Sequence, residues 1–268
     1  MDSPRAAGGP GEIEAALQGK LPRLIELGDI RGDLHMHTTE TDGSSSVAEM
    51  ALVAAACGLR YIAIADHSKA LAMANGLDEV RLRKQGKAIE EANAALDGRI
   101  RVLRGIEVDI LREGTLDLEE AALRELDVVV ASVHSAFNLP KQEMTARVIH
   151  AIETGAVDIV GHPTGRILLR REPYAVEMEA VMRAAKFHGV AMELNAFPDR
   201  LDISDVHCRM AKDIGVKIVI STDSHTPAHL RLMGYGVGNA RRGWLEAKDV
   251  LNTRDADEFV RLLHEGHR

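Results

Sequence analysis

The sequence has little cysteine and few aromatic residues, and it contains no long apolar run. Two of its 268 residues are cysteines and 3% are aromatic. No apolar segment reaches the roughly 20 residues of a membrane-spanning helix. Cys57 and Cys208 exclude a disulfide framework, and both are expected to be small buried side chains within helices. The N-terminal stretch also lacks the apolar core of a signal peptide, so a cytoplasmic protein without membrane contact is predicted.

Several function classes are disfavoured by what else is missing. The chain has no GxSxG nucleophile elbow, P-loop, GxGxxG or CxxC motif, which argues against serine-hydrolase chemistry and nucleotide cofactors. Its formal charge is −8, and an acidic surface repels the phosphate backbone of nucleic acids. Broad non-specific binding of nucleic acid by this chain alone is therefore not expected, although a local basic spot near the site could hold one phosphate.

The residues that are present predict an α/β fold. Hydrophobic residues make up 46% of the chain, which is enough for one large core. Residues 1–30 are expected to form a flexible, linker-like N-terminal arm: a disordered lead-in over 1–11, a short helix over 12–18, and an arm over 22–30. Residues 31–268 are expected to form a single domain.

Short β-rich runs alternate with helical patterns along this domain. Strands are predicted over 33–37, 61–66, 102–108, 128–134, 158–162, 190–195 and 217–222. Helices are predicted over 46–57, 78–96, 118–125, 141–154, 176–188, 204–213 and 255–264. Seven alternations favour a parallel, closed or nearly closed barrel, and a doubly wound open sheet is the alternative.

Histidines and carboxylates follow the ends of these predicted strands. His35 and His37 are two residues apart on one strand, so both imidazoles face one side, about 6.5 to 7 Å apart. Glu107 lies in an apolar run, where a buried carboxylate must be paired or metal-bound. Asp109, two residues on, faces the same side and could be either a partner that supports a metal ligand or a loop residue, and the loop residue is the preferred prediction. The full set of candidate metal ligands is His35, His37, Asp42, His67, Glu107, His134, His162, Asp223 and His225.

Six imidazoles and three carboxylates without a thiolate suit manganese, zinc or iron. Nine ligands exceed the needs of one cation, so two or three divalent metal ions are predicted. Clustered cations can activate a water molecule and hold phosphoryl oxygens during displacement. The other histidines are expected at the surface: His150, His188, His207, His229, His264 and His267.

The motifs DLHMHTTETDG, IAIADHS, GIEVDI, ASVHS, GHPTGR and STDSH resemble those of the PHP (polymerase and histidinol phosphatase) family over about residues 31–245. Within that family the chain is most similar to the C-terminal PHP domain of bacterial family X DNA polymerases. The resemblance implies a distorted (β/α)7 TIM-like barrel and a trinuclear metal site. It implies a first metal held by His35, His37, Glu107 and Asp223, a second by Glu107, His134 and His162, and a third by Asp42, His67 and His225.

In the family X polymerases the resembling domain is a manganese-dependent 3′–5′ exonuclease, and other relatives hydrolyse histidinol phosphate or similar monoesters. This sequence lacks the polymerase and helix–hairpin–helix modules, so the chain is expected to be either a domain of a parent protein that has them or a stand-alone product. Processive exonuclease action is therefore doubtful.

Four residues are expected to face substrate. Arg166 is the preferred phosphate clamp, because its guanidinium matches two phosphate oxygens. Lys69, Asn195 and Arg200 are further candidates. Asp223, His225 and Arg166 are the predicted catalytic residues.

The primary hypothesis is a metal-dependent phosphoester hydrolase that acts on phosphodiesters, including DNA 3′ ends, and on small phosphate esters. Three alternatives stay open: a phosphomonoesterase of the histidinol-phosphatase type, a two-metal amidohydrolase, and a non-catalytic PHP module.

Overall fold

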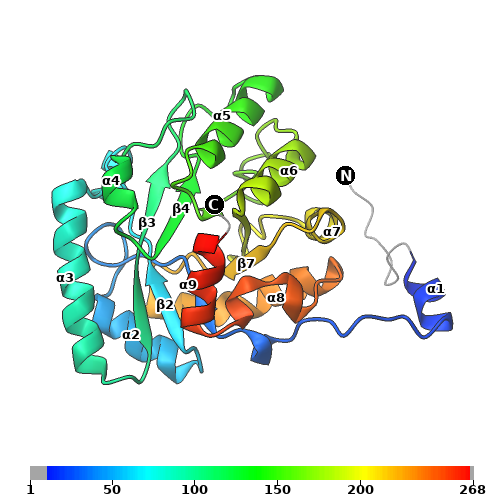
Figure 1. Cartoon of the computed structure of the whole chain (residues 1–268), viewed down its shortest axis with the longest axis horizontal. Helices are drawn as coiled ribbons and strands as arrows, with labels where there is room; N and C mark the ends of the chain where they lie inside the picture. The colour runs from blue at the N-terminus through cyan, green and yellow to red at the C-terminus, as the bar shows by residue number, and fades with distance from the viewer. Residues whose placement is uncertain (1–10, 266–268) are drawn as a thin grey trace.

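Seven parallel strands form the centre of the computed structural model, which describes residues 11–265. Each strand hydrogen-bonds to the next in the order β1 to β7, and helices cover the outside (Figure 1). This consecutive order rules out the doubly wound alternative and confirms the predicted nearly closed barrel. The strands are β1 (Gly32–Asp33), β2 (Tyr61–Ile64), β3 (Arg101–Asp109), β4 (Val128–Ser132), β5 (Ile159–Val160), β6 (Ala191–Asn195) and β7 (Ile218–Ser221).

The helices follow the predicted positions closely because start and stop signals mark them. The side chain of Ser46 accepts a hydrogen bond from the Glu49 backbone and forms a capping box, and Gly215 ends a helix in the left-handed conformation. The helices are α1 (Glu12–Leu17), α2 (Val47–Ala56), α3 (Glu79–Leu96), α4 (Glu120–Leu123), α5 (Lys141–Glu153), α6 (Met178–His188), α7 (Asp205–Ile214), α8 (Met233–Arg242) and α9 (Ala256–Glu265). Short 3-10 turns are η1 (Leu27–Asp29), η2 (Ala72–Ala74), η3 (Pro227–Leu232), η4 (Ala247–Asp249) and η5 (Leu251–Thr253).

Helix α8 was not predicted, because its sequence MGYGVGNARR contains three glycines, which are poor helix formers. One of these glycines allows the helix to pack. A Cβ at Gly236 would lie 2.6 Å from the Ile220 side chain and 2.7 Å from that of Ala196. Close packing on β6 and β7 therefore outweighs the weak intrinsic preference for helix.

Alternation along the strands separates two apolar layers. In β2, Tyr61 and Ala63 point into the barrel, whereas Ile62 and Ile64 pack in the layer shared with the helices. Phe259 of α9 joins the inner layer, with its ring centroid 5.4 Å from that of Tyr61. Since Tyr61 begins β2, α9 closes the end of the barrel where the strands start, and the opposite end remains for function.

A seam lies between the first and last strands. The side-chain amide of Asn252 donates to the carbonyls of Gly32 (2.7 Å) and Ile220 (2.8 Å), and its oxygen accepts from the Ile220 N–H (3.1 Å). Beyond both strands, Met36 and Ser224 form an isolated parallel bridge. The Asn252 side chain and the single Met36–Ser224 bridge thus connect β1 and β7 in place of a continuous ladder of backbone hydrogen bonds. The predicted strand over 33–37 is correspondingly shorter, because the chain after Asp33 bends into the site.

The N-terminal arm partly packs on the domain. The N–H of Ile25 donates to the Leu245 carbonyl at 2.9 Å, and Arg241 donates to the Ile25 carbonyl at 2.8 Å. The arm runs along α8 to the barrel (Figure 1). The predicted lead-in lies outside the described residues apart from Gly11, and the domain boundary at residue 31 stays a prediction.

Two smaller points complete the fold. Cys208 is buried as predicted, but Cys57 is exposed, because it caps the C-terminus of α2 and faces away from the core. None of the helices in the described part of the chain is long and apolar enough to cross a membrane.

Candidate metal centre

All nine predicted ligands meet at the carboxyl ends of the strands. His67 follows β2, and the backbones of His67 and Glu107 form a bridge that continues the pairing of β2 with β3. His134 and His162 follow β4 and β5, as expected for a barrel whose functional groups extend from its strand ends. Asp223 and His225 follow β7 and lie across the seam from His35 and His37.

Glu107 is the centre of this arrangement. Its Oε2 lies 2.8 Å from His67 Nδ1 and 3.3 Å from His35 Nε2. Its Oε1 lies 3.2 Å from His162 Nε2 and 3.3 Å from His134 Nε2. One buried carboxylate therefore faces imidazoles delivered from four different strands.

Asp223 forms the second central carboxylate. Its Oδ1 is 3.2 Å from His37 Nε2, and its Oδ2 is 3.6 Å from His162 Nε2. The backbones of Asp223 and His162 have positive φ angles, 54° and 43°, which residues other than glycine rarely adopt. Such backbone strain is typical of functional positions.

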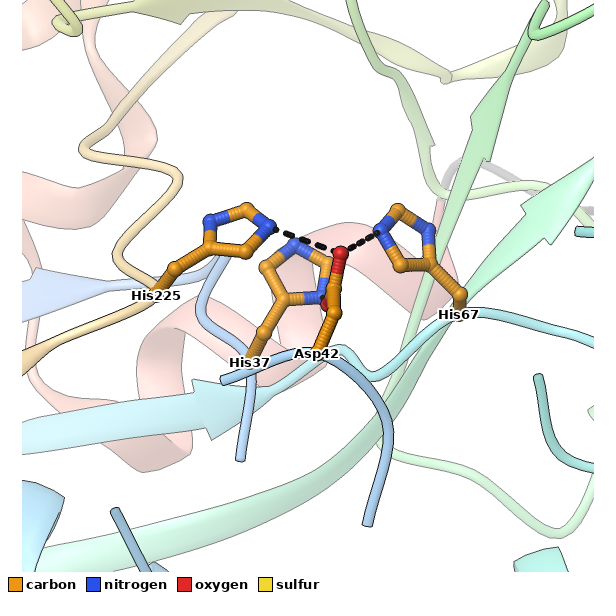
Figure 2. A group of neighbouring side chains, drawn as sticks. All are labelled: His37, Asp42, His67 and His225. Carbon is orange, nitrogen blue, oxygen red and sulfur yellow. Dashed lines mark ion pairs between the residues drawn. The ribbon is translucent and has the colours of Figure 1, made fainter. Parts of the chain in front are cut away.

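A more open cluster lies beside them. Asp42 Oδ2 is 3.4 Å from His225 Nε2 and 3.5 Å from His67 Nε2, with His37 behind (Figure 2). Ligand atoms of these four residues all lie within 4.8 Å of one another. Asp42 and His225 are the most exposed of the nine, so the site opens to solvent on this side.

Asp66 shapes the loop that carries Asp42. Its carboxylate accepts hydrogen bonds from the Thr38 N–H (2.7 Å), the Thr38 and Thr41 hydroxyls, and the Gln85 amide. Gly43 makes the turn possible, since a Cβ there would lie 2.4 Å from the His37 carbonyl oxygen. The carboxylate that directly precedes His67 thus builds the loop of the open cluster.

The charges of the site shift its pKa values strongly. Burial alone would raise the pKa of Glu107, but the positive charges of His35, His134 and His67 outweigh it and hold that pKa well below its usual range. Burial would lower the pKa of His67 and His134, but the negative charge of Glu107 prevails and raises them to about 10 and about 9. Burial and the charge of His67 lower the pKa of His37 to about 4.

Unpartnered buried atoms test whether cations fit. Both carboxylate oxygens of Glu107, Nε2 of His35, and Nδ1 of His37 and His67 are buried, and despite their short separations none of them forms a hydrogen bond of suitable geometry. Native proteins rarely leave such groups unsatisfied, and these are all metal-ligating atoms. The donor set therefore fits divalent cations. Four groups of side chains could each hold one: His37, Asp42, His67 and His225; His35, His37 and Glu107; His35, His162 and Glu193; and His67, Glu107 and His134.

Glu193 was missed by the sequence analysis. It is fully buried in β6, with Oε1 2.7 Å from His35 Nδ1 and Oε2 accepting from the His162 backbone N–H at 2.9 Å. The signal was available, because the run VAMELN places a carboxylate among apolar residues as RVLRGIEVDI does for Glu107.

The expectation for Asp109 was wrong. It ends β3 rather than lying in a loop, it is buried, and its Oδ1 lies 3.1 Å from His134 Nδ1. A carboxylate in this place fixes the orientation of a metal-binding imidazole. The β3 strand runs one residue beyond the predicted end because its ladder with β4 continues to Ser132.

The predicted substrate-facing residues lie in different surroundings. Arg200 is mostly buried, with Nε 3.5 Å from Asp223 Oδ2, and Asn195 donates toward Asp223 Oδ2 at 3.3 Å. Arg166 donates to the carbonyls of Arg200 and Leu201, so its guanidinium holds the loop that carries Arg200. Lys69 pairs with Glu79 at 2.8 Å.

The remaining histidines are not all surface residues. His229 is half-buried beside the site, where its Nδ1 accepts from the His225 N–H at 3.2 Å and its ring lies against Phe197. His207 is also half-buried. His150 and His264 are exposed, His188 is intermediate, and His267 lies outside the described residues.

Comparisons with known proteins agree with this geometry. Residues 33–197 match the family model described as PHP domain. The chain is 45% identical over 240 residues to the DNA polymerase/3′–5′ exonuclease PolX of Bacillus subtilis; this covers 90% of the chain and 42% of that relative. It is 33% identical over 247 residues to a probable phosphatase of Thermoanaerobacter sp., covering 88% of the chain and 95% of the relative.

The fold is shared with a solved structure. Histidinol phosphate phosphatase from Lactococcus lactis, in complex with zinc, L-histidinol and phosphate, superposes with a TM-score of 0.58 and 18% sequence identity. The match covers 78% of this chain and 93% of that chain.

Proposed function

Because this chain belongs to the PHP family of phosphoesterases, we propose that it hydrolyses phosphodiesters at a trinuclear metal centre. The proposed substrates are the 3′ ends of DNA and, more broadly, small phosphate mono-, di- and triesters. Similarity to the Bacillus subtilis exonuclease supports the DNA substrate. The chain spans less than half the length of that relative. We therefore also propose that polymerase modules of a parent protein bring DNA to the site.

The surroundings of Glu107 carry this proposal. Both of its oxygens are buried without a hydrogen-bond partner, and each faces at least two imidazoles. We propose that Glu107 is shared between two cations. The nine residues named from the sequence would hold the metals, which when bound would lower the pKa of a water molecule and neutralise phosphoryl oxygens. Manganese, zinc and iron suit these donors, and the zinc of the Lactococcus lactis structure supports zinc.

The protein's own groups would bind and orient the substrate. Arg200 is the best-placed cation, because its guanidinium already lies beside Asp223 and could turn to a phosphate oxygen. Asn195 can donate a second hydrogen bond from the floor of the site. Arg166 would act through its hold on the carbonyls of Arg200 and Leu201, and Lys69 would act from the rim once released from Glu79.

His225 and Asp223 are proposed to take part at the open side. The Nδ1–H of His225 donates to the Asp223 carbonyl at 2.9 Å, which fixes Nε2 as the atom that faces Asp42 and the mouth of the site. His225 would thereby offer Nε2 to a cation held together with Asp42, on the side of the site where a leaving group would depart.

The second candidate is a phosphomonoesterase for small substrates. It is favoured by the similarity to the Thermoanaerobacter probable phosphatase, because the match covers 95% of the length of that relative. Arg200 could serve a terminal phosphate as well as a diester. The two candidates differ in which ester is turned over faster.

A substrate panel with manganese distinguishes these functions. The panel contains p-nitrophenyl phosphate, bis(p-nitrophenyl) phosphate, an aryl phosphotriester and a 3′-labelled oligonucleotide. We expect the diester and the oligonucleotide to be hydrolysed, and His134→Ala and Asp223→Ala to abolish this while circular dichroism stays unchanged. Glu179→Gln, on the exposed face of α6, is the matched control. No turnover of any phosphoester, together with no bound metal by mass spectrometry, would leave only a non-catalytic module.

A further inference from the structure

A basic loop with two exposed leucines borders the metal centre. Residues 166–171, RILLRR, follow His162 at the end of β5, and we call them the arginine loop. The Leu169 side chain is fully exposed, that of Leu168 is exposed, and Arg170 is 75% exposed. The three arginines of residues 163–174 are accompanied by one acidic residue, Glu172. This segment is basic in a chain with a net charge of −8.

Hydrogen bonds fasten the arginine loop to the segment that delivers Arg200. The Leu168 N–H donates to the Asp199 carbonyl at 2.6 Å, and Ile167 and Arg171 form a tight antiparallel bridge. Arg170 lies 3.8 Å from the Asp199 carboxylate, and Arg166 holds the Arg200 carbonyl. The loop is therefore held at a fixed place on the rim, next to the cation closest to the metal ligands.

One side of the loop packs against the domain, and the other side is exposed to solvent. The Arg171 guanidinium stacks over the Phe137 ring at 4.1 Å and donates to the Gly165 carbonyl at 2.7 Å. Burial and the charge of Arg200 lower the pKa of Arg171. Leu169 is fully exposed, and Arg170 is 75% exposed although it lies beside the Asp199 carboxylate, so an apolar side chain and a cation are both accessible to solvent at adjacent positions.

This pairing suits one kind of ligand. Arginine binds phosphate oxygens through its planar guanidinium, and basic residues supply most of the affinity of proteins for nucleic-acid backbones. Leucine is among the apolar side chains that minor-groove-binding proteins insert between the base steps of DNA, which shows that a leucine side chain can contact the face of an unstacked base. A small phosphate ester would reach Arg200 but would have nothing to place against Leu169.

We propose that the arginine loop binds a single-stranded nucleic acid whose terminal phosphodiester lies in the metal centre, with Arg170 on an upstream phosphate and Leu169 against a base. This rests on the proposed phosphodiesterase function. It adds a strand-binding surface that separates polymeric from small substrates. Hydrolysis of small esters does not need this surface.

The test compares binding and hydrolysis in charge-matched variants. Arg170→Glu is compared with Arg261→Glu, which makes the same charge change on α9 at the opposite end of the barrel. Leu169→Ala is compared with Phe187→Ala, an exposed apolar residue near the end of α6. The probe is a fluorescent oligothymidylate with phosphorothioate linkages, whose anisotropy reports binding to the metal-loaded protein without turnover.

We expect Arg170→Glu to weaken oligothymidylate binding about tenfold. The slope of the logarithm of affinity against the logarithm of salt concentration should become shallower by about one. Leu169→Ala should weaken binding without changing that dependence, and both controls should bind as the wild type does. All four should hydrolyse bis(p-nitrophenyl) phosphate at the wild-type rate. Absent binding by the wild type, or equal binding by Arg170→Glu and Arg261→Glu, would refute the strand-binding surface. Absent hydrolysis of the aryl diester by the wild type would instead refute the proposed function.

Discussion

Replacing Glu193 by glutamine tests how far the metal centre depends on a carboxylate that the sequence analysis overlooked. Glu193 accepts from His35 Nδ1 at 2.7 Å and from the His162 N–H at 2.9 Å, through different oxygens. A glutamine of the same shape offers one oxygen and one NH2 group. As long as His35 carries a proton on Nδ1, one buried donor faces another donor whichever way the amide turns.

The magnitude follows from that mismatch. A buried donor left unsatisfied costs about 1–3 kcal/mol, so the metal-free Glu193→Gln protein should lose about that much free energy of unfolding. His35 also loses a negative partner that orients its ring and increases its basicity. Loss of such a partner typically weakens metal binding 10- to 100-fold, which is about 1.4–2.8 kcal/mol.

Two measurements separate these effects. Urea denaturation of the chelated protein gives the first, and manganese titration against a competing chelator gives the second. Glu179→Gln serves as the control, and its stability should change by no more than about 0.5 kcal/mol, as is usual at the surface. Wild-type metal affinity and wild-type stability in Glu193→Gln would show that the Glu193 contacts contribute nothing, and the reasoning would be wrong.

Three further outcomes are expected. Asp42→Ala should lower the metal content per chain measured by mass spectrometry while the chelated protein keeps its melting temperature, because Asp42 is half-exposed and lies outside the core. Metal binding at pH 8 should release protons, measurable by calorimetry in buffers of different ionisation enthalpy. Glu107 raises the pKa of His67 to about 10 and that of His134 to about 9, so the metal-free centre holds protons at pH 8 that metals displace. The apparent metal affinity should therefore rise with pH up to pH 9–10. Uptake of protons on metal binding would contradict this. Phe259→Ala should lower the free energy of unfolding, measured by urea denaturation, by about 3–5 kcal/mol, because it leaves a cavity at the closed end of the barrel. A loss below about 1 kcal/mol would show that α9 does not support the core.

The barrel and its nine central residues could be predicted because two independent patterns coincide. Apolar runs of strand length mark where each strand ends, and His67, His134 and His162 stand at three of those ends. Parallel strands bring their carboxyl ends to one side, so positions far apart in the sequence become neighbours without any knowledge of the loops. Glu193 could have been found by the rule that identified Glu107.

What could not be predicted depends on the paths of loops and on packing. Whether Arg166 turns to a phosphate or to the Arg200 carbonyl is decided by a backbone that local sequence does not specify. Helix α8 forms against its own propensity because Gly236 lets it approach β7. His229 reaches the site because η3 turns the chain back after His225.

The seam between the first and last strands has a consequence for biosynthesis. The imidazoles of His35 and His37 are synthesised before the rest of the barrel, whereas Asp223 and His225, which lie across the seam from them, follow its last strand. A nascent chain therefore carries an incomplete set of ligands until the last strand of the barrel has been made. Binding of metals by the full ligand set would then require β7 and Asn252 to dock onto β1, and the bound ions would join the two ends of the barrel.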